Sequence, residues 1–332
     1  MVYNREMSEK VAIEVKGLSK HFSVPVKAEG FGASVKSLFY REYKSVKAVE
    51  KISFRIEEGE MVGFLGPNGA GKTTTMKMLS GILYPSNGVV KVLGYNPTDR
   101  KPAFQKQISM VMGQKNQLWW DLPATDAYIL NKEIFNIPTH EYKQTLDELV
   151  ALLGVEEILS TPVRKLSLGQ RMKCELIAAL LHRPKVLFLD EPTIGLDVVT
   201  QKKVREFLKK INREMKTTIL LTSHYMEDVQ AVCPRVIMIN RGAKLYDGTI
   251  DNLIKTYATE KYLQVDFDNE IPREKLEAIG RVVEYEGTRV VIAVPRVAHA
   301  KKAAELLTTY TVDNLDIQEI KLEDIIVKHF SK

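Results

Sequence analysis

The chain has 332 residues, of which 45% are hydrophobic and 27% charged, a composition typical of globular proteins with one large domain or two ordinary ones. No apolar run approaches the ~18 residues that a membrane-spanning helix needs, and the first residues lack the apolar core of a signal peptide, so we expect the chain to stay in the cytoplasm. Two isolated cysteines, Cys174 and Cys233, exclude a disulfide framework and are not spaced to bind a metal.

The net charge of +6 is unevenly divided along the chain. Residues 1–249 hold 36 basic and 27 acidic side chains, whereas residues 250–332 hold 12 basic and 15 acidic ones. A basic first part suits phosphate ligands, anionic lipid surfaces or nucleic acid, and charge alone does not choose among them. Because the hydrophobic pattern also changes near residue 250, we expect two domains with these bounds.

The first predicted elements are two strands separated by an insert. Residues 11–22 predict a strand that enters a turn, and residues 52–56 alternate apolar and polar side chains as a strand does. Within the insert, residues 23–46, apolar side chains recur at helical spacing beside basic ones. These are Phe31, Val35, Leu38 and Phe39, with Lys36, Arg41, Lys44 and Lys47. Such an amphipathic helix either packs against the chain's own sheet or contacts a lipid surface or a partner.

The next predicted elements alternate strands with helices. Residues 61–65 predict a short strand, a glycine-rich turn follows, and a helix runs from about Lys72 to Gly81. Residues 125–154 predict helical structure, and Gly154 stands where a helix would end. Helical patterns separate the later apolar strands, which favours a parallel sheet with crossover helices. These strands are residues 186–189, 219–222 and 236–239.

Beyond about residue 250, the predicted order is βαββαβ. The strands are residues 262–267, 281–285, 290–294 and 316–320, and the helices are residues 273–279 and 298–310. This order is that of the split βαβ, ferredoxin-like unit, so we expect residues 250–332 to form a small α+β domain.

A glycine-rich segment between a predicted strand and helix fits the pattern G-x-x-x-x-G-K-[ST]. Its residues are Gly66, Pro67, Asn68, Gly69, Ala70, Gly71, Lys72 and Thr73, and Thr74 follows. Glycines let the backbone curl so that its N–H groups and the helix amino terminus face phosphate oxygens. In this pattern, Lys72 reaches the β- and γ-phosphates and the Thr73 hydroxyl binds Mg²⁺. The segment alone predicts a nucleotide phosphate site, which kinases, GTPases and motor proteins share.

Two further segments narrow the class of protein. The apolar strand at residues 186–189 leads directly into Asp190 and Glu191. Asp190 occupies the position of the acid that holds Mg²⁺ in P-loop proteins, and Glu191 is then free to polarise the attacking water. Residues 166–171 place Ser167 and Gly169 at the start of a predicted helix. A serine and a glycine there form either a second anion site or an ordinary helix cap.

Taken in order, these segments resemble the ATP-binding subunits of ABC transporters, from about residue 11 to residue 250. The resemblance is carried by residues 66–73, Gln114, residues 166–170, Asp190-Glu191, Gly195-Leu196-Asp197 and His224. It implies an α/β fold, a P-loop NTPase of ABC type with a mixed-sheet core and a helical subdomain at residues 115–180. It also implies two copies arranged head to tail, with ATP and Mg²⁺ held between them.

The resemblance also assigns individual roles. Gln114 contacts Mg²⁺ and the attacking water, and His224 holds the γ-phosphate. Ser167, Gly169 and Gln170 contact the γ-phosphate of the partner copy, and Asp197 links the two sites. Phe22 stacks on adenine, although core packing of this ring is nearly as well supported. One position departs from the family pattern, because Leu168 stands where a glycine is usual.

The function implied is that of an ATPase subunit that energises an exporter from the cytoplasmic face of the membrane. Because no spanning helix is expected, separate transmembrane subunits are required as partners. Residues 119–123 and the small second domain favour export by likeness to the family. The alternatives are an importer ATPase with a regulatory tail and a soluble ABC-type ATPase. Soluble members that act on ribosomes carry two phosphate loops, and those that repair DNA insert long coiled coils. This sequence shows neither feature, so no nucleic acid partner is expected.

Overall fold

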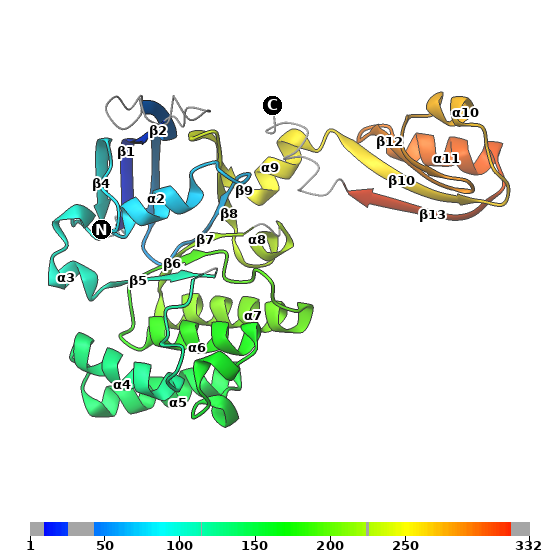
Figure 1. Cartoon of the computed structure of the whole chain (residues 1–332). Coiled ribbons are helices and arrows are strands. Elements are labelled where there is room, and N and C mark those ends of the chain that lie inside the picture. The colour runs from blue at the N-terminus through cyan, green and yellow to red at the C-terminus, as the bar shows by residue number, and fades with distance from the viewer. Residues whose placement is uncertain (1–9, 26–42, 114, 224–225, 320–332) are drawn as a thin grey trace, which may run out of the picture. The chain divides into compact units, whose positions relative to one another are not determined.

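The computed structural model describes residues 10–25, 43–113, 115–223 and 226–319. The chain divides into two compact units, Met1–Asp247 and Gly248–Lys332. The first unit contains two sheets with one helix between them and further helices beyond (Figure 1). The second contains a single sheet with its own helices.

A six-stranded central sheet organises the first unit (Figure 1). In spatial order its strands are β5 (Ile108–Met112), β6 (Val186–Asp190), β7 (Thr218–Thr222), β3 (Met61–Leu65), β8 (Arg235–Asn240) and β9 (Ala243–Thr249). The pairs β5–β6, β6–β7, β7–β3 and β3–β8 are parallel, as the sequence predicts. Strands β3, β6 and β7 are buried along their whole length, which explains why their central residues are apolar.

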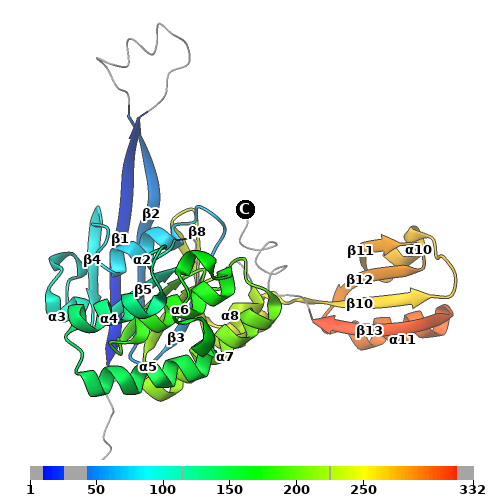
Figure 2. The ribbon, with the colours of Figure 1, turned by 60° about the horizontal axis from the view of Figure 1, so that its bottom comes forward.

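A second, antiparallel sheet has the order β2-β1-β4 and contains two long strands (Figure 2). Its strands are β1 (Val11–Pro25), β2 (Tyr43–Glu57) and β4 (Asn87–Val92). Residues 23–25 and 43–46, which the sequence pattern assigns to an insert, are therefore strand: Ser23 pairs with Ser45, and Pro25 with Tyr43. Hydrogen bonds between β1 and β2 satisfy the backbone N–H and C=O groups of both segments. The paired residues are distant in the sequence, so the local pattern does not reveal this pairing. The helically spaced apolar residues of the insert lie outside the described residues.

Seven helices are described in the first unit. They are α2 (Lys72–Leu79), α3 (Pro102–Gln105), α4 (Ala124–Phe135), α5 (Thr139–Leu153), α6 (Leu168–Leu180), α7 (Val198–Met215) and α8 (Met226–Val232). The helical structure predicted for residues 125–154 is present as two helices, α4 and α5, because the chain breaks at residues 136–138. Asn136 adopts a left-handed backbone with φ 53°, and Pro138 has no N–H with which to continue a helix. Within the described ranges, every helix falls short of the length and apolar character that crossing a membrane requires.

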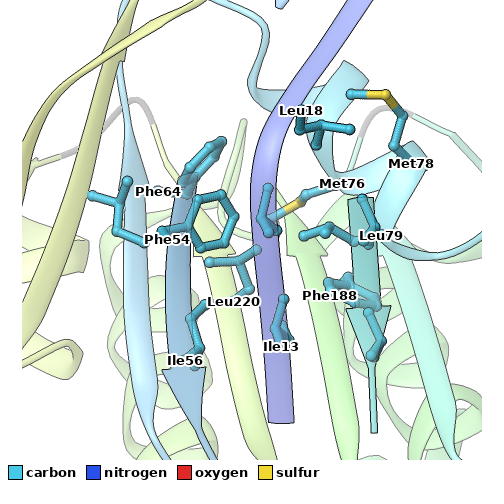
Figure 3. Close-up of a cluster of buried hydrophobic side chains, with 14 of the residues drawn as sticks. Ile13, Leu18, Phe54, Ile56, Phe64, Met76, Met78, Leu79, Phe188 and Leu220 are labelled. Carbon is cyan, nitrogen blue, oxygen red and sulfur yellow. The ribbon is translucent and has the colours of Figure 1, made fainter. Parts of the chain in front are cut away.

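The core of the first unit joins the two sheets through helix α2 (Figure 3). Its side chains come from every layer: Ile13, Leu18, Phe54, Ile56, Phe64, Met76, Met78, Leu79, Phe188 and Leu220. The rings of Phe54 and Phe64 lie 5.8 Å apart between their centroids. Because α2 is buried between β1–β2 on one side and β6–β7 on the other, its amino terminus is fixed relative to the carboxyl ends of the central strands.

The second unit has the βαββαβ order that the sequence predicts, preceded by helix α9 (Ile250–Tyr257). Its elements are β10 (Glu260–Phe267), α10 (Arg273–Glu277), β11 (Arg281–Glu286), β12 (Arg289–Pro295), α11 (His299–Thr309) and β13 (Val312–Glu319). The sheet order β11-β12-β10-β13, antiparallel throughout, is that of a ferredoxin-like domain. Alternate residues of β10, Leu263, Val265 and Phe267, pack with Leu276 and Leu306 of the two helices.

Replacing Leu220 with alanine should test the joint core. The side chain is fully buried at the centre of the cluster, so Leu220→Ala should lower the free energy of unfolding of the first unit by about 2–5 kcal/mol. Urea unfolding without nucleotide measures the change. Val198→Ala, at a position 75% exposed, should stay within about 0.5 kcal/mol of the wild type. Equal losses in both variants would contradict the described core.

Candidate nucleotide site

The glycine-rich segment runs from the end of β3 into the start of α2. Gly69 and Gly71 both have a positive φ, 78° and 104°, which side chains of L-residues rarely adopt. A Cβ atom on Gly71 would lie 2.4 Å from the carbonyl oxygen of Ala48, so a larger residue does not fit there. Gly71 is also the N-cap of α2 and offers no side-chain acceptor to the first turn. A phosphate at this helix terminus would meet the partial positive charge of the helix.

The Lys72 side chain folds back over the loop. Its Nζ donates to the carbonyl oxygens of Gly66 at 2.7 Å and Pro67 at 3.1 Å. Burial lowers the pKa of Lys72, while Glu191 and Asp190 act in the opposite direction and favour the charged form. The ammonium is thus held above the loop, close to two carboxylates and ready to pair with an anion.

Thr73 and Asp190 meet although 117 positions separate them in the sequence. The Thr73 hydroxyl donates to Asp190 Oδ2 at 2.7 Å, and the Thr222 hydroxyl donates to Asp190 Oδ1 at 2.7 Å. Thr222 is the last residue of β7, so the ends of two neighbouring strands are tied to the start of α2. A hydroxyl and a carboxylate are oxygen ligands of the kind that Mg²⁺ prefers, so these residues fit such an ion.

Glu191 is held in an uncommon backbone conformation with φ 57°. Its N–H donates to Thr222 Oγ1 at 3.0 Å and to the Thr222 carbonyl oxygen at 3.1 Å. On the other side, a Cβ on Gly113 would lie 2.1 Å from the Glu191 carbonyl oxygen, so only glycine fits at the end of β5. A left-handed non-glycine residue costs about 1–3 kcal/mol, which the surrounding contacts must offset. Gly113 and Thr222 belong to no sequence motif, and their positions at the ends of predicted strands are the one signal that points to them.

Residues 166–170 start helix α6 with a capping box. The N–H of Gln170 donates to Ser167 Oγ at 3.2 Å, and the N–H of Ser167 donates to Gln170 Oε1 at 2.9 Å. Gly169 leaves space for Thr200, because a Cβ there would lie 3.0 Å from Thr200 Cγ2. Leu168, which departs from the family pattern, packs at Gly195: a Cβ on Gly195 would lie 2.8 Å from Leu168 Cδ2.

Asp197 caps helix α7 on an exposed face. Its carboxylate accepts from the Thr200 N–H at 2.9 Å and from the Thr200 hydroxyl at 2.7 Å, and these bonds lower its pKa. The next two residues, Val198 and Val199, are 75% and 66% exposed. Gly169, two residues after the α6 cap Ser167, and Asp197 therefore meet at Thr200, whereas Lys72, Thr73, Asp190 and Glu191 gather at the glycine loop.

The remaining predicted site residues are less closely placed. Phe22 lies on β1 opposite Val46, 37% exposed, with the Lys20 ammonium 5.2 Å from the ring centroid. It is thus outside the described core, and its stacking on adenine stays a prediction. Thr74 is half-buried in the first turn of α2. The predicted roles of Gln114 and His224 concern positions outside the described residues.

The arrangement at the glycine loop defines a P-loop nucleotide triphosphatase. A family model described as "ABC transporter" matches residues 49–194, and one described as "EvrA-like ABC transporter, C-terminal domain" matches residues 259–318. The chain is 36% identical over 222 residues to the ABC transporter ATP-binding protein NatA of Bacillus subtilis (strain 168), covering 67% of this chain and 90% of that relative. The chain belongs to the ATP-binding proteins of ABC transporters; it binds ATP and hydrolyses it.

Other similar proteins extend over more of the chain. The linearmycin resistance ATP-binding protein LnrL of Bacillus subtilis (strain 168) is 28% identical over 288 residues, 86% of this chain and 92% of that relative. The methionine import ATP-binding protein MetN 2 of Enterococcus faecalis (strain ATCC 700802 / V583) is 30% identical over 264 residues, 77% of this chain and 76% of that relative. A solved ATP-binding subunit of an ABC transporter superposes with a TM-score of 0.61 at 26% identity, over 74% of this chain and 93% of that one.

The close approach at Gly71 generates one prediction. Gly71→Ala should displace the loop and lower ATP affinity by at least about 100-fold, or about 2.7 kcal/mol, because the new methyl group would overlap the Ala48 carbonyl. Binding of a fluorescent ATP analogue measures this. Gly94→Ala is the matched control: its φ is also positive, 79°, but no atom lies within 4 Å of the added Cβ. If both variants bind ATP as the wild type does, the loop does not hold the phosphates.

A second prediction concerns Glu175 of α6, which is only 2% exposed. Burial raises the pKa of Glu175 to about 7 from its ordinary 4.5, although the Gln117 N–H at 3.4 Å and Arg171 at 4.0 Å lower it. An unfolded chain releases this proton near pH 4.5 and the folded chain only near pH 7, so this residue increasingly destabilises the fold between those values. Glu175→Gln should therefore gain stability relative to the wild type as pH rises, by up to about 3 kcal/mol.

Urea unfolding of wild type and Glu175→Gln at pH 5, 6, 7 and 8 measures this difference. It should grow up to about pH 7 and then level off. A difference independent of pH would mean that Glu175 keeps an ordinary pKa in the folded chain.

Proposed function

We propose that the chain is the ATPase subunit of a membrane exporter, working as a head-to-tail pair of copies with separate transmembrane subunits at the cytoplasmic face of the membrane. The observation that carries the proposal is the separation of the two groups of site residues. Lys72, Thr73, Asp190 and Glu191 gather at the glycine loop, while Gly169 and Asp197 meet at Thr200 on an exposed face. Two copies in opposite orientation would bring one group against the other.

The chemistry follows from charge. Lys72 and the amino terminus of α2 favour the phosphate oxygens at the loop, and the carboxylates at its edge need a cation to lie beside a nucleotide. Mg²⁺, when bound by Thr73 and Asp190, would neutralise phosphate charge. Glu191, one residue after Asp190, takes the proton of the attacking water as general base. The Thr222 and Gly113 contacts hold the backbone of Glu191 and thereby orient this base.

The exposed face around Asp197 suits a second copy. Val198 and Val199 present adjoining apolar side chains to solvent beside a charged residue whose pKa is lowered. The Ser167 end of α6 adds a helix amino terminus that would favour the γ-phosphate of the partner copy. The γ-phosphate of ATP would balance the positive amino termini of α2 in one copy and α6 in the other. ATP binding therefore closes the pair, and hydrolysis lets it open.

A separate apolar surface on α4 and the segment before it suits the transmembrane subunits. Trp119, Trp120, Ile129 and Ile134 are all about half exposed there. Beside them is a cavity of about 260 Å³ lined by Gln117, Trp119, Leu130, Phe135 and His182, among others. Exposed aromatic and aliphatic side chains beside a hollow are typical of sites that receive an apolar segment of another protein.

Import is the second candidate, and the methionine import relative favours it. Export is preferred because the linearmycin resistance relative covers more of this chain and the second unit matches the EvrA-like C-terminal domain. Pull-down of the full chain from membranes of its own cells, followed by identification of copurifying polytopic proteins, tests the need for partners. Substrate uptake into inside-out vesicles that hold this complex would indicate export, and uptake into right-side-out vesicles would indicate import.

Replacing the general base should separate binding from hydrolysis. Glu191→Gln removes the basic carboxylate at nearly constant shape, so kcat should fall by about 10²–10⁴ while ATP binding remains. With ATP and Mg²⁺, the variant should accumulate as a dimer in size-exclusion chromatography with light scattering. Glu206→Gln, on the same helix as Asp197 but away from the loop, is the control. Wild-type turnover in Glu191→Gln would show that another group is the base, and a strictly monomeric ATP-bound variant would contradict the pair of copies.

A further inference from the structure

A buried carboxylate on α8 joins three segments that the proposed reaction uses. Asp228 is 1% exposed, and it belongs to none of the motifs considered above. Its Oδ1 pairs with Arg205 Nη1 at 2.9 Å, and its Oδ2 accepts from the hydroxyls of Thr193 and, at 3.3 Å, Ser223. Both carboxylate oxygens are therefore engaged by donors from separate parts of the chain.

Two of these donors, Thr193 and Ser223, lie within two positions of residues of the proposed site. Thr193 follows Glu191 by two positions and is itself buried. Ser223 comes directly after β7, which ends at Thr222, the partner of both Asp190 and Glu191, and it directly precedes His224 in the sequence. A shift of Asp228 would therefore move the segment after Glu191 and the end of β7 together.

Arg205 brings helix α7 into the same network. Helices α7 and α8 lie side by side, and Arg205 is two turns along α7 from its cap, Asp197 (Figure 1). In the first turn of α7, Gln201 Nε2 donates to the carbonyl oxygen of Leu196 at 3.1 Å. The helix is thus attached to the segment after Glu191 at its start and to Asp228 farther along. A rigid helix transmits a displacement at Asp197 to both points of attachment.

We propose that Asp228 is a positioning residue for ATP hydrolysis, which holds the segment after Glu191 and the end of β7 in a fixed relation to helix α7. This inference rests on the role proposed above for Glu191 and on the exposed face at Asp197. Alternative uses of a buried carboxylate fit less well. Arg205 neutralises its charge and two hydroxyls use its acceptor capacity, so Asp228 is a structural acceptor and not an acid or base.

The test compares two substitutions of Thr193 in the full chain. Thr193→Val keeps the shape but removes the hydroxyl donor, and Thr193→Ser restores that donor. We expect Thr193→Val to lower kcat by about tenfold or more with the KM for MgATP within twofold, because a small misplacement of the base affects chemistry more than binding. Thr193→Ser should return to within twofold of the wild type.

Thr217→Val is the matched control for stability. The Thr217 hydroxyl is equally buried and donates to the carbonyl oxygen of Pro184 at 3.1 Å, away from Asp228. It should lower the urea midpoint as Thr193→Val does, but leave kcat unchanged. If both valine variants keep wild-type kcat, or if both lose it in proportion to stability, Asp228 has no positioning role.

Further variants distinguish a failure of the positioning role of Asp228 from a failure of the role proposed for Glu191. Arg205→Met removes the ion pair to Asp228 at a side chain that is partly exposed. It should reproduce the kcat loss even if Thr193→Val folds poorly. The stabilisation of the folded chain by MgATP should stay at the wild-type level in both variants, because binding is retained and only the chemical step is slowed. Glu191→Gln is assayed alongside: wild-type turnover there overturns the base assignment. Wild-type turnover in Thr193→Val and Arg205→Met, with Glu191→Gln inactive, overturns this inference alone.

Discussion

The hydrogen bond between Thr73 and Asp190 is the contact on which the rest of the site depends. It joins the first turn of α2 to the end of β6, and the Thr222 hydroxyl extends it to the end of β7. The bond forms because the carboxyl ends of parallel strands meet at one edge and because α2 is wedged between two sheets by the core around Phe64. Packing far from the loop therefore decides where the loop's charges lie.

The sequence sufficed where structure is determined locally. The glycine loop, the strand ending in Asp190 and the βαββαβ order of the second unit each carry their signal within a few adjacent residues, and the fold class is confirmed. Glycine at 71 is required by its own φ and by a neighbour that the loop itself brings close. For such residues, residue type and spacing already contain the physical constraint.

Features that depend on distant partners escaped prediction. The long β1–β2 pairing reaches Pro25 and Tyr43 because the partner strand satisfies the backbone there, whereas the local sequence pattern predicts an insert. The left-handed backbone of Glu191 follows from Thr222 and Gly113, and the burial of Asp228 follows from α7. The break between α4 and α5 is different, since Asn136 and Pro138 carried a local signal that the apolar stripe of α5 outweighed.

The contact between Leu168 and Gly195 has a consequence for how this chain can vary. The leucine at the start of α6 fills the volume that a side chain at 195 would need, and Gly195 also has a φ of 71°. A side chain at position 195 would therefore require the end of the Leu168 side chain to move. A relative with glycine at position 168 would not have this steric conflict. Substitutions at positions 168 and 195 should therefore be correlated among relatives of this protein.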